Sequence, residues 1–600
     1  MSHNPPSSKL IRGGAFLIDD SRPEQTFTPE EFNEEQLMIK GMVTDYIEAE
    51  IWPVVERIEK QEPGLMPSLL RKMAEQGMLG SHMPQAFGGL QLDTNTNTLI
   101  TDVLGASSAS FTVAYAVQTG IGMLPILYFG TEKQKANYLP KLISGEIIAA
   151  YCLTEPGSGS DALAAKTRAD LTEDGEHYLI NGQKMWISNA GFADLFVVFA
   201  QVDGDKFTGF LVPADTDGLS LGAEEDKLGI KGSSTRQVFF ENVKIPTENL
   251  LGEIGKGHLI AFNALNTGRF KLHALSLGGA KRAISQGIQY ANERHQFKQP
   301  ISNFGAIKYK VGNCAIRTFA AESALYRVSQ MLQDHAEASK DQGIVYGEAK
   351  RAAAEEYAIE CALLKFTGSE VLDYVIDEVL QIHGGMGYSE ETPIAKAYRD
   401  SRINRIYEGT NEINRLLSVD MLLRRAMKGA IDLVGPAWSV QKELASMPSL
   451  EPASGSYGEE IKAVKNFKKL ILMVAGAAAK QQMDGELNLK EEQEILMNVA
   501  DMLGDLLEAE SLLLRLQKME NQTLKHPESV YQAILKVYLH DANARMAKNA
   551  TDAVASFVEG DLLRTFTMGI KRFTKYPPQN VKKLRREVAD YLIKANAYTL

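Results

Sequence analysis

Hydrophobic residues recur with a helical period along most of the chain, and one central stretch follows a different pattern. Apolar positions return every three or four residues from about 28 to 146, from 257 to 432 and from 459 to 600, as on the buried faces of helices. From 147 to 256, short runs of β-branched and aromatic residues alternate with turns, and Asn181–Gly182 is typical of a tight hairpin. These patterns predict an α+β protein with several domains.

The same patterns, with the turn-forming residues between them, suggest where the domains begin and end. We expect an N-terminal arm over 1–27, a helical domain over 28–146, a β domain over 147–256, a helical domain over 257–432, a linker over 433–458 and a further helical domain over 459–600. Thr28, Pro29 and Glu31 form a capping pattern that predicts a helix start, and "TEKQ" at 131–134 repeats it. Proline, glycine and serine are frequent over 446–458, which favours a linker there.

Composition narrows the class of protein. The 600 residues are 44% hydrophobic and 23% charged, which are ordinary values for a globular protein. The formal net charge of -12 argues against general nucleic-acid binding, which favours a basic surface. Cys152, Cys314 and Cys361 are far apart and form no CxxC pair, so we expect neither a disulfide framework nor a metal site, and a reducing compartment.

Membrane insertion is not expected from the hydropathy pattern. The most apolar run, Leu470 to Ala479, is about half of the ~20 residues that a spanning helix needs. The first residues, "MSHNPPSSKLIRGG", lack the apolar stretch of a signal peptide and the Arg-rich amphipathic pattern of an organelle presequence. We therefore expect a cytoplasmic location.

One glycine-rich motif resembles a dinucleotide-binding turn. "LTEPGSGSDALAAK" places Gly157, Gly159 and Ala162 in a GxGxxA pattern after an apolar strand. A Rossmann turn must open a helix within a βαβ unit, and here more strands follow instead. We expect a turn whose glycines allow close backbone approach, and whose N–H and hydroxyl groups can hold phosphate or flavin oxygens.

A carboxylate stands at a break between helices in "RIYEGTNEINRLL", residues 405–417. Glu408 is followed directly by Gly409 and Thr410. From this stretch alone, Glu408 is either a solvated loop residue or a base at the mouth of a pocket.

Five stretches, taken together and in order, resemble the acyl-CoA dehydrogenase family. They are "YCLTEPGSGSD" (151–161), "NGQKMWISN" (181–189), "NERHQF" (292–297), "QIHGGMGY" (381–388) and "RIYEGTNEI" (405–413). The added helical segment after residue 430 is similar to that of the very-long-chain branch and its bacterial fatty-acid-degradation relatives. The resemblance implies an N-terminal helical domain, a middle β-barrel or sandwich, a C-terminal four-helix bundle and an extra helical domain.

The resemblance also implies a reaction. Family members remove one hydrogen from each of the α and β carbons of an acyl-CoA thioester; a glutamate takes the α proton and N5 of FAD takes the β hydride. Glu408 matches that base, its backbone N–H matches a donor to the thioester oxygen, and Gly409 leaves room for substrate. Some branches carry the base on another helix, but the matching residue here is Gly268, which cannot act as a base.

Further site residues follow from the resemblance alone. Those matched to FAD contacts are Tyr151, Leu153, Thr154, Ser160, Trp186, Ile187, Ser188, Arg294, Gln296, Phe297, Gln381, Gly384, Gly385, Thr410 and Glu412. Among them, Arg294, Gln296, Phe297 and the Gln381 segment are expected to reach the FAD of a neighbouring subunit. Substrate contacts are expected from Ser160, Asn266, Arg269 and Gly409; many shorter-chain members have aspartate in place of Asn266.

The sequence also suggests the acyl-chain length of the substrate and the partners of the protein. Val113 and Val117 stand where medium-chain members place polar residues that close the acyl pocket, so a deep pocket for long chains is expected. The resemblance implies electron transfer to an electron-transfer flavoprotein and a homodimer, with a tetramer as the alternative. The basic end of the chain, from Arg564 to Arg586, is either a solvated face or a weak membrane-attracting surface.

Two other functions remain open at this point. An acyl-CoA oxidase would use oxygen as its acceptor and would form peroxide. An assembly or scaffolding protein could keep the fold and use its C-terminal segment to bind partners, although an intact Glu408 argues against it.

Overall fold

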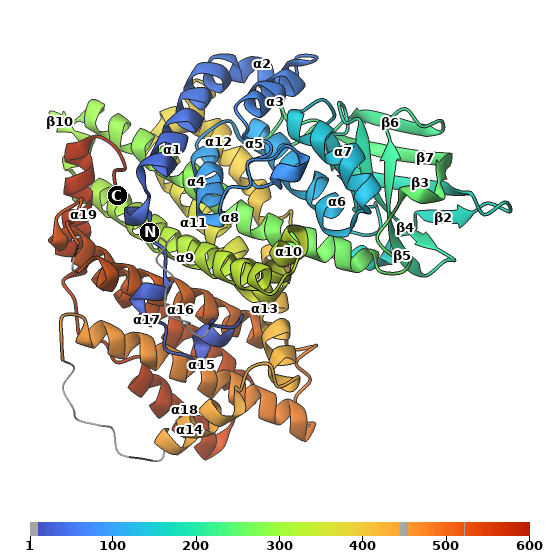
Figure 1. Ribbon diagram of the computed structural model, residues 1–600. Coiled ribbons are helices and arrows are strands. Elements are labelled where there is room, and N and C mark those ends of the chain that lie inside the picture. The colour runs from blue at the N-terminus through green and yellow to red at the C-terminus, as the bar shows by residue number, and fades with distance from the viewer. Residues whose placement is uncertain (1–9, 445, 447–453, 521) are drawn as a thin grey trace.

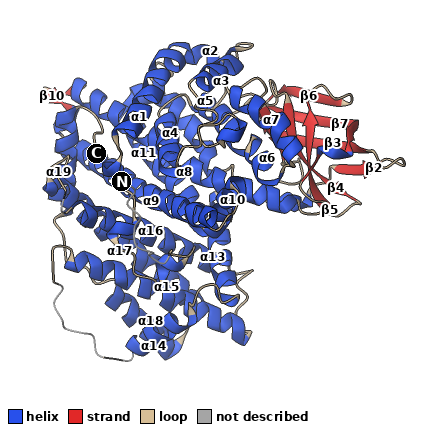
Figure 2. Ribbon diagram, in the orientation of Figure 1, coloured by secondary structure: helices blue, strands red, loops and turns tan. Residues whose placement is uncertain are grey.

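The computed structural model describes residues 10–444, 446, 454–520 and 522–600. Helices form most of the molecule, and the strands are concentrated in one domain at its edge (Figure 2). The observed order is helical, β, helical and helical, which confirms the predicted fold class.

The N-terminal domain is built from seven helices around an apolar core. They are α1 (Glu34–Tyr46), α2 (Val55–Glu59), α3 (Leu65–Glu75), α4 (Thr94–Gly105), α5 (Ala109–Val117), α6 (Leu124–Phe129) and α7 (Glu132–Ser144). Thr131 and Gln134 cap α7 reciprocally, as predicted. The first helix begins later than predicted: Pro29–Glu31 forms only a short 3-10 turn, and α1 starts after Asn33, whose side chain accepts from the N–H of Gln36.

One segment of this domain is long and apolar enough to be a candidate membrane span, contrary to expectation. Ala109–Phe129, which joins α5 and α6 through the π-helix η7 (Gln118–Gly122), could cross a membrane by length and composition. However, 89% of its most apolar part is buried inside the protein. It is therefore a core segment of the N-terminal domain.

The middle domain is one eight-stranded sheet with the order β6-β7-β3-β2-β4-β5-β8, and β1 pairs in parallel with β4. The strands are β1 (Ala149–Cys152), β2 (Arg168–Leu171), β3 (His177–Ser188), β4 (Leu195–Val202), β5 (Lys206–Pro213), β6 (Leu219–Glu224), β7 (Thr235–Pro246) and β8 (Leu250–Leu251). Both faces of β4 are buried, because Phe196 packs in the core of the sheet domain and Val197 packs against the N-terminal helices.

The hairpin predicted at Asn181–Gly182 is wrong. β3 continues through both residues, and its register against β7 shifts between Ile180 and Gly182. A Cβ on Gly182 would lie 2.5 Å from the hydroxyl oxygen of Thr167, so this glycine permits the close approach of the segment before β2.

The third domain is a helical bundle in which α8, α9 and α11 pack on one another and α13 packs on α11. Its elements are α8 (Gly257–Glu293), β9 (His295–Gln296), β10 (Gln299–Pro300), α9 (Gly305–Asp341), α10 (Tyr346–Glu356), α11 (Ala358–His383), α12 (Pro393–Ser401) and α13 (Asn411–Met427). The last domain contains α14 (Val434–Leu444), α15 (Gly458–Asp484), α16 (Gln493–Met519), α17 (Glu528–Phe557), α18 (Gly560–Phe573) and α19 (Val581–Ala595).

The last domain shares one hydrophobic core with the bundle, so it is not a free appendage. α16 and α19 both pack on α9. The segment expected as a linker over 433–458 is only partly one, since α14 occupies Val434–Leu444; residues 447–453 of that segment lie outside the described residues.

The expected arm is packed, at least over its described part from residue 10. Its 3-10 turns η1 (Ala15–Leu17) and η2 (Pro23–Gln25) pack on α16, beside the last domain in Figure 1, and Phe16 is fully buried in the shared core. Lys468 of α15 donates to the carbonyl oxygen of Asp19, and Lys518 of α16 donates to that of Thr26. The arm thus joins the bundle to the last domain.

Candidate active site

Glu408 lies in a tight loop between the 3-10 turn η12 (Arg402–Arg405) and α13. Its backbone is left-handed, with φ 59°, and Gly409 follows with φ 80°. The Asn414 side-chain amide donates to the carbonyl oxygens of Glu408, Gly409 and Thr410, at 3.3, 2.8 and 3.0 Å. A glutamate held in this rarely populated conformation is typical of a functional loop, since the surrounding structure must stabilise it.

The carboxylate of Glu408 faces inward without a partner. Its Oε2 is buried and accepts no hydrogen bond within the described chain. Burial raises the pKa of Glu408 to about 7, although the positive charges of Arg269 and Lys365 lower it. A carboxyl group with a pKa near neutrality is suited to taking a proton at physiological pH.

Gly268 of α8 provides the space that this carboxylate occupies. A Cβ at position 268 would lie 2.6 Å from Glu408 Oε2, too close for any side chain. The glycine predicted to exclude a second base therefore also makes room for the first.

Arg269 and Asn266 lie on the same helix and support the loop. Arg269 Nε donates to the carbonyl oxygen of Glu408 at 3.3 Å, and its Nη1 donates to Asn266 Oδ1 at 3.0 Å. Both side chains are buried. The structure thus brings three of the predicted site residues together, and a contact of Arg269 or Asn266 with substrate stays a prediction.

Lys365 was not identified from the sequence. This buried α11 residue donates from Nζ to Asn411 Oδ1 at 2.7 Å, and burial lowers its pKa to about 7 while the charge of Glu408 opposes that shift. Its only sequence signal is a lysine within the apolar run "CALLKF".

The β domain contributes an exposed aromatic ring and an unpartnered hydroxyl, and the hydroxyl lies near the base. Trp186 sits at a bulge in β3 with φ 57° and is 60% exposed, while the neighbouring Ile187 is buried. The Tyr151 hydroxyl is buried without a partner, and its pKa is raised by burial and then by the negative charge of Glu408. A β-bulge commonly re-aims a side chain beside a site.

A buried ion pair shapes the glycine-rich turn after β1. Glu155 accepts from the N–H groups of Lys166 and Thr167 and pairs with Lys184 Nζ at 2.7 Å. The Thr154 carbonyl accepts from the N–H of Met185, which ties the turn to β3 next to Trp186. A three-residue 3-10 turn and then β2 follow, so the rejection of a Rossmann unit is confirmed.

The remaining residues of the β domain and of the Glu408 loop that were predicted to contact FAD differ in their exposure. Leu153 is buried, Ser188 is half-buried, and Ser160 is exposed beside Gly157 and Gly159, where an added Cβ would meet nothing within 4 Å. Thr410 caps α13 by accepting from the N–H of Ile413, and Glu412 is exposed in its first turn.

A second set of predicted residues lies at the opposite end of the molecule from the β domain (Figure 1). Arg294, Gln296 and Phe297 are exposed on or beside the β9–β10 hairpin, and Phe297 is 88% exposed. Tyr290 stacks on His383, with ring centroids 4.2 Å apart, which holds the hairpin end of α8 beside the end of α11. Gln381, Gly384 and Gly385 are exposed there. Both groups of residues therefore lie far from β3, the strand that carries Trp186 (Figure 1).

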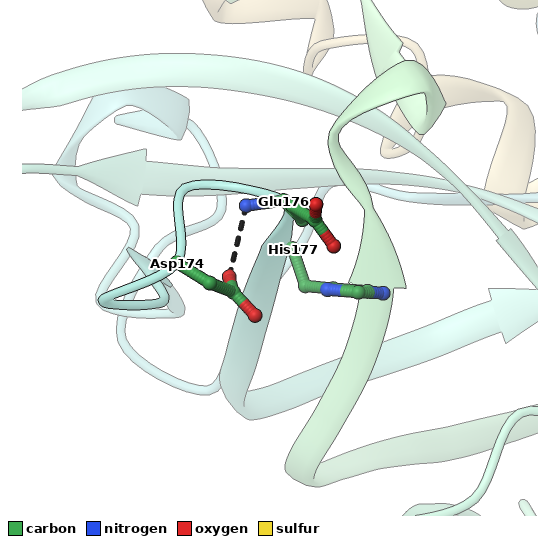
Figure 3. Close-up of side chains that lie close together, drawn as sticks. All are labelled: Asp174, Glu176 and His177. Carbon is green, nitrogen blue, oxygen red and sulfur yellow. Dashed lines mark hydrogen bonds between the residues drawn. The ribbon is translucent and has the colours of Figure 1, made fainter.

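One group of potential metal ligands occurs in the described chain, on the β2–β3 turn (Figure 3). It comprises Asp174, Glu176 and His177. Asp174 Oδ1 already accepts from the Thr172 hydroxyl and from the N–H of Glu176. The turn geometry accounts for this grouping, and its position on a hairpin tip does not involve Glu408.

Comparison with known proteins agrees with this geometry. Models of the acyl-CoA dehydrogenase N-terminal, middle and C-terminal domains match residues 33–146, 150–243 and 255–423, and a further C-terminal domain model of that name matches 466–572. The chain belongs to the acyl-CoA dehydrogenase family. It is thus an FAD-dependent oxidoreductase, and the scaffolding alternative is set aside.

Three similar proteins extend this result. A probable acyl-CoA dehydrogenase of Bacillus subtilis (strain 168) is 44% identical, with 99% of each chain covered. The mitochondrial very long-chain specific acyl-CoA dehydrogenase of Bos taurus is 32% identical over 93% of this chain and 86% of its own. A crystal structure of an acyl-CoA dehydrogenase complexed with FAD, from Bacillus anthracis, has a TM-score of 0.95 and 43% identity, covering 98% of this chain and all (100%) of that one.

The residues of this acyl-CoA dehydrogenase fit FAD. Trp186 offers an uncovered ring, Tyr151 an unpartnered buried hydroxyl, and Gly157 and Gly159 an open backbone approach. We expect Thr154, Trp186 and Ser188 to hold the flavin end from this chain.

The raised pKa of Glu408 predicts the pH dependence of activity. Because the base must be deprotonated, kcat/KM should rise about tenfold per pH unit below pH 7 and level off above it. Replacing Lys365 with Met removes a charge that lowers this pKa, so the midpoint should move to higher pH. Steady-state rates between pH 5.5 and 8.5 test this; a flat profile in both proteins would contradict it.

Proposed function

We propose that this protein converts long-chain acyl-CoA to trans-2-enoyl-CoA, the first step of fatty-acid β-oxidation. The observation that carries the proposal is the buried, unpartnered Oε2 of Glu408 beside a backbone N–H that is also free. The N–H of Glu408 makes no hydrogen bond within the described chain. One loop therefore offers an acceptor for the α proton and a donor for the thioester oxygen.

In this mechanism Glu408 Oε2 takes the proton from the α carbon. The N–H of Glu408 donates to the thioester oxygen, where negative charge develops as the proton leaves. Asn414 and Arg269 hold the carbonyls of the loop, which keeps both groups aimed at the same thioester. Bound FAD would supply the acceptor for the hydride that leaves the β carbon.

Long chains are favoured by two considerations. Val113 and Val117 are buried with Ile230 in a small apolar cluster packed against Tyr407, the residue before the base. Each additional buried CH₂ contributes about 0.8 kcal/mol, so an apolar wall there favours longer chains. The bovine relative is specific for very long chains by name.

Anaerobic titration with acyl-CoAs of graded length tests the proposal. Flavin absorbance should bleach rapidly, with the fastest reduction for long chains, and an electron-transfer flavoprotein should reoxidise the enzyme. No bleaching by any acyl-CoA would refute the dehydrogenase proposal. Peroxide formation at a comparable rate with oxygen alone would identify an oxidase instead.

We also propose a homodimer in which Arg294 and the Gln381 segment reach a neighbour's FAD. Both are exposed at the end opposite to this chain's β domain. Sedimentation should show a dimer, and Arg294→Met should lower FAD retention without unfolding the chain. A monomer that is fully loaded with FAD would contradict this arrangement.

Weak attraction to anionic membranes, for an enzyme otherwise in the cytoplasm, is a further proposal. Lys571, Lys575, Lys582 and Lys583 are exposed near the C-terminus, whereas Arg585 pairs with Asp541 at 2.8 Å. Exposed lysines near anionic lipid contribute about 1 kcal/mol each. Sedimentation with anionic liposomes should recover the protein at low salt but not at high salt, and replacing these four lysines with Gln should abolish the difference. Equal recovery at both salt concentrations would remove this proposal.

A further inference from the structure

A cavity of about 90 Å³ borders α8, the helix that also carries Gly268. Thr267, Phe270 and Lys271 line it, while Gly268, between them in sequence, faces Glu408. A single water needs about 10–15 Å³ on this scale, so the cavity has room for a larger group.

The lining is divided between apolar walls and cationic groups. Leu124, Leu127 and Phe270 contribute apolar surface, and Lys271 and Lys350 contribute ammonium groups. Such a lining suits a ligand with both an alkyl part and a negative charge.

Neither lysine is neutralised by the protein. Lys271 Nζ donates to the Thr119 carbonyl at 2.9 Å, and Lys350 Nζ donates to the Thr94 hydroxyl at 2.6 Å. Neither forms an ion pair with a carboxylate in the described ranges, although both are only half-buried, whereas the fully buried Lys184 pairs with Glu155. Two enclosed cations without a counter-ion are costly unless an anion joins them.

Other polar atoms of the lining also lack partners. His82 Nε2 and Asn97 Oδ1 are buried and make no hydrogen bond within the described chain. Burial lowers the pKa of Lys271 to about 7 and that of Lys350 to about 8. A bound anion would reverse both shifts, because a neighbouring negative charge favours the protonated ammonium.

We propose that this cavity binds a carboxylate group attached to an alkyl chain, with Lys271 and Lys350 as its counter-charges. The carboxylate has two sources. In the first, it is the far end of a dicarboxylic acyl chain whose thioester lies at Glu408; this source rests on the proposed function. In the second, it belongs to a free carboxylic acid.

Two measurements on the FAD-loaded enzyme separate these sources. The first compares kcat/KM for dicarboxylic mono-CoA thioesters with that for monocarboxylic acyl-CoAs of equal length. The second measures binding of free adipate and hexanoate by calorimetry, which needs no turnover. Both are repeated on Lys271→Met and Lys350→Met, with Lys428→Met, an exposed lysine, as the matched control.

For the chain-end source, the wild type and the control should prefer the dicarboxylic thioester, and each cavity variant should lose about tenfold or more of that preference. For the free acid, the thioesters should show no preference, and calorimetric binding should weaken about tenfold or more in each cavity variant. If the wild type shows neither the preference for dicarboxylic thioesters nor binding of the free acid, the proposal is overturned.

Folding failure does not obscure the result. Lys271→Met removes no ion pair and relieves an enclosed charge, so its Tm should equal or exceed that of the wild type. If no thioester is oxidised at all, the proposed function fails, and calorimetry alone then decides the carboxylate site.

Discussion

Replacing Glu408 with Gln is expected to reduce turnover by about 10²–10⁴-fold, the usual contribution of a general base. The amide keeps the size of the side chain and the backbone N–H, but it cannot take a proton. FAD content and acyl-CoA binding should be retained, since the loop is held by Asn414 and Arg269 through backbone carbonyls and not through the Glu408 carboxylate.

The measurement combines stopped-flow flavin reduction with a spectral titration of bound acyl-CoA. Glu56→Gln, which changes an exposed glutamate on α2, serves as the control and should behave as the wild type. Turnover near normal in Glu408→Gln would require another base. Gly268, the one alternative position considered, has no side chain to supply it.

The order of helical and β domains could be predicted because periodicity is a local property of the sequence. The errors arose where distant residues decide the structure. Asn181–Gly182 has strong turn chemistry, but β3 and β7 pair along most of their lengths and carry the strand through it. The arm shows no local sign that Phe16 is buried, because α16, on which its turn packs, lies more than 400 residues away.

In the candidate site too, the sequence predicts the local features but not those that depend on distant residues. The helix break and Glu408 are visible in "RIYEGTNEI", but its unusual φ depends on Asn414 and on Arg269, which is 139 residues distant. Lys365 and the space at Gly268 became apparent only when α8, α11 and the loop were assembled. Contacts of Arg294 and Gln381 with a neighbour's cofactor stay predictions.

Replacing Arg515 with Met is expected to destabilise the protein by about 3–5 kcal/mol, as is usual when one member of a buried ion pair is removed. Arg515 of α16 is 2% exposed and pairs with Glu30 at 2.6 Å and with Glu322 of α9 at 2.8 Å. Its guanidinium also lies over the ring of Phe319, 3.8 Å from the centroid. The substitution leaves the partly buried Glu30 without this cationic partner.

The consequence should extend beyond α16, because Arg515 joins the N-terminal segment, the bundle and the last domain at one point. Arg564→Met is the matched control: its partner Asp561 is 95% exposed, and exposed pairs contribute about 0–1 kcal/mol. Thermal unfolding should show a large drop in Tm for Arg515→Met and almost none for Arg564→Met, and a chain that ends near residue 445 should be insoluble. Equal Tm values for the two variants, together with a soluble, flavin-loaded truncated chain, would mean that the last domain does not stabilise the catalytic body. The buried charge of Glu322 on α9 would then have to be tolerated without Arg515. The pKa of Glu322 argues against this, because Lys281 and Arg515 lower it to about 2 although burial raises it.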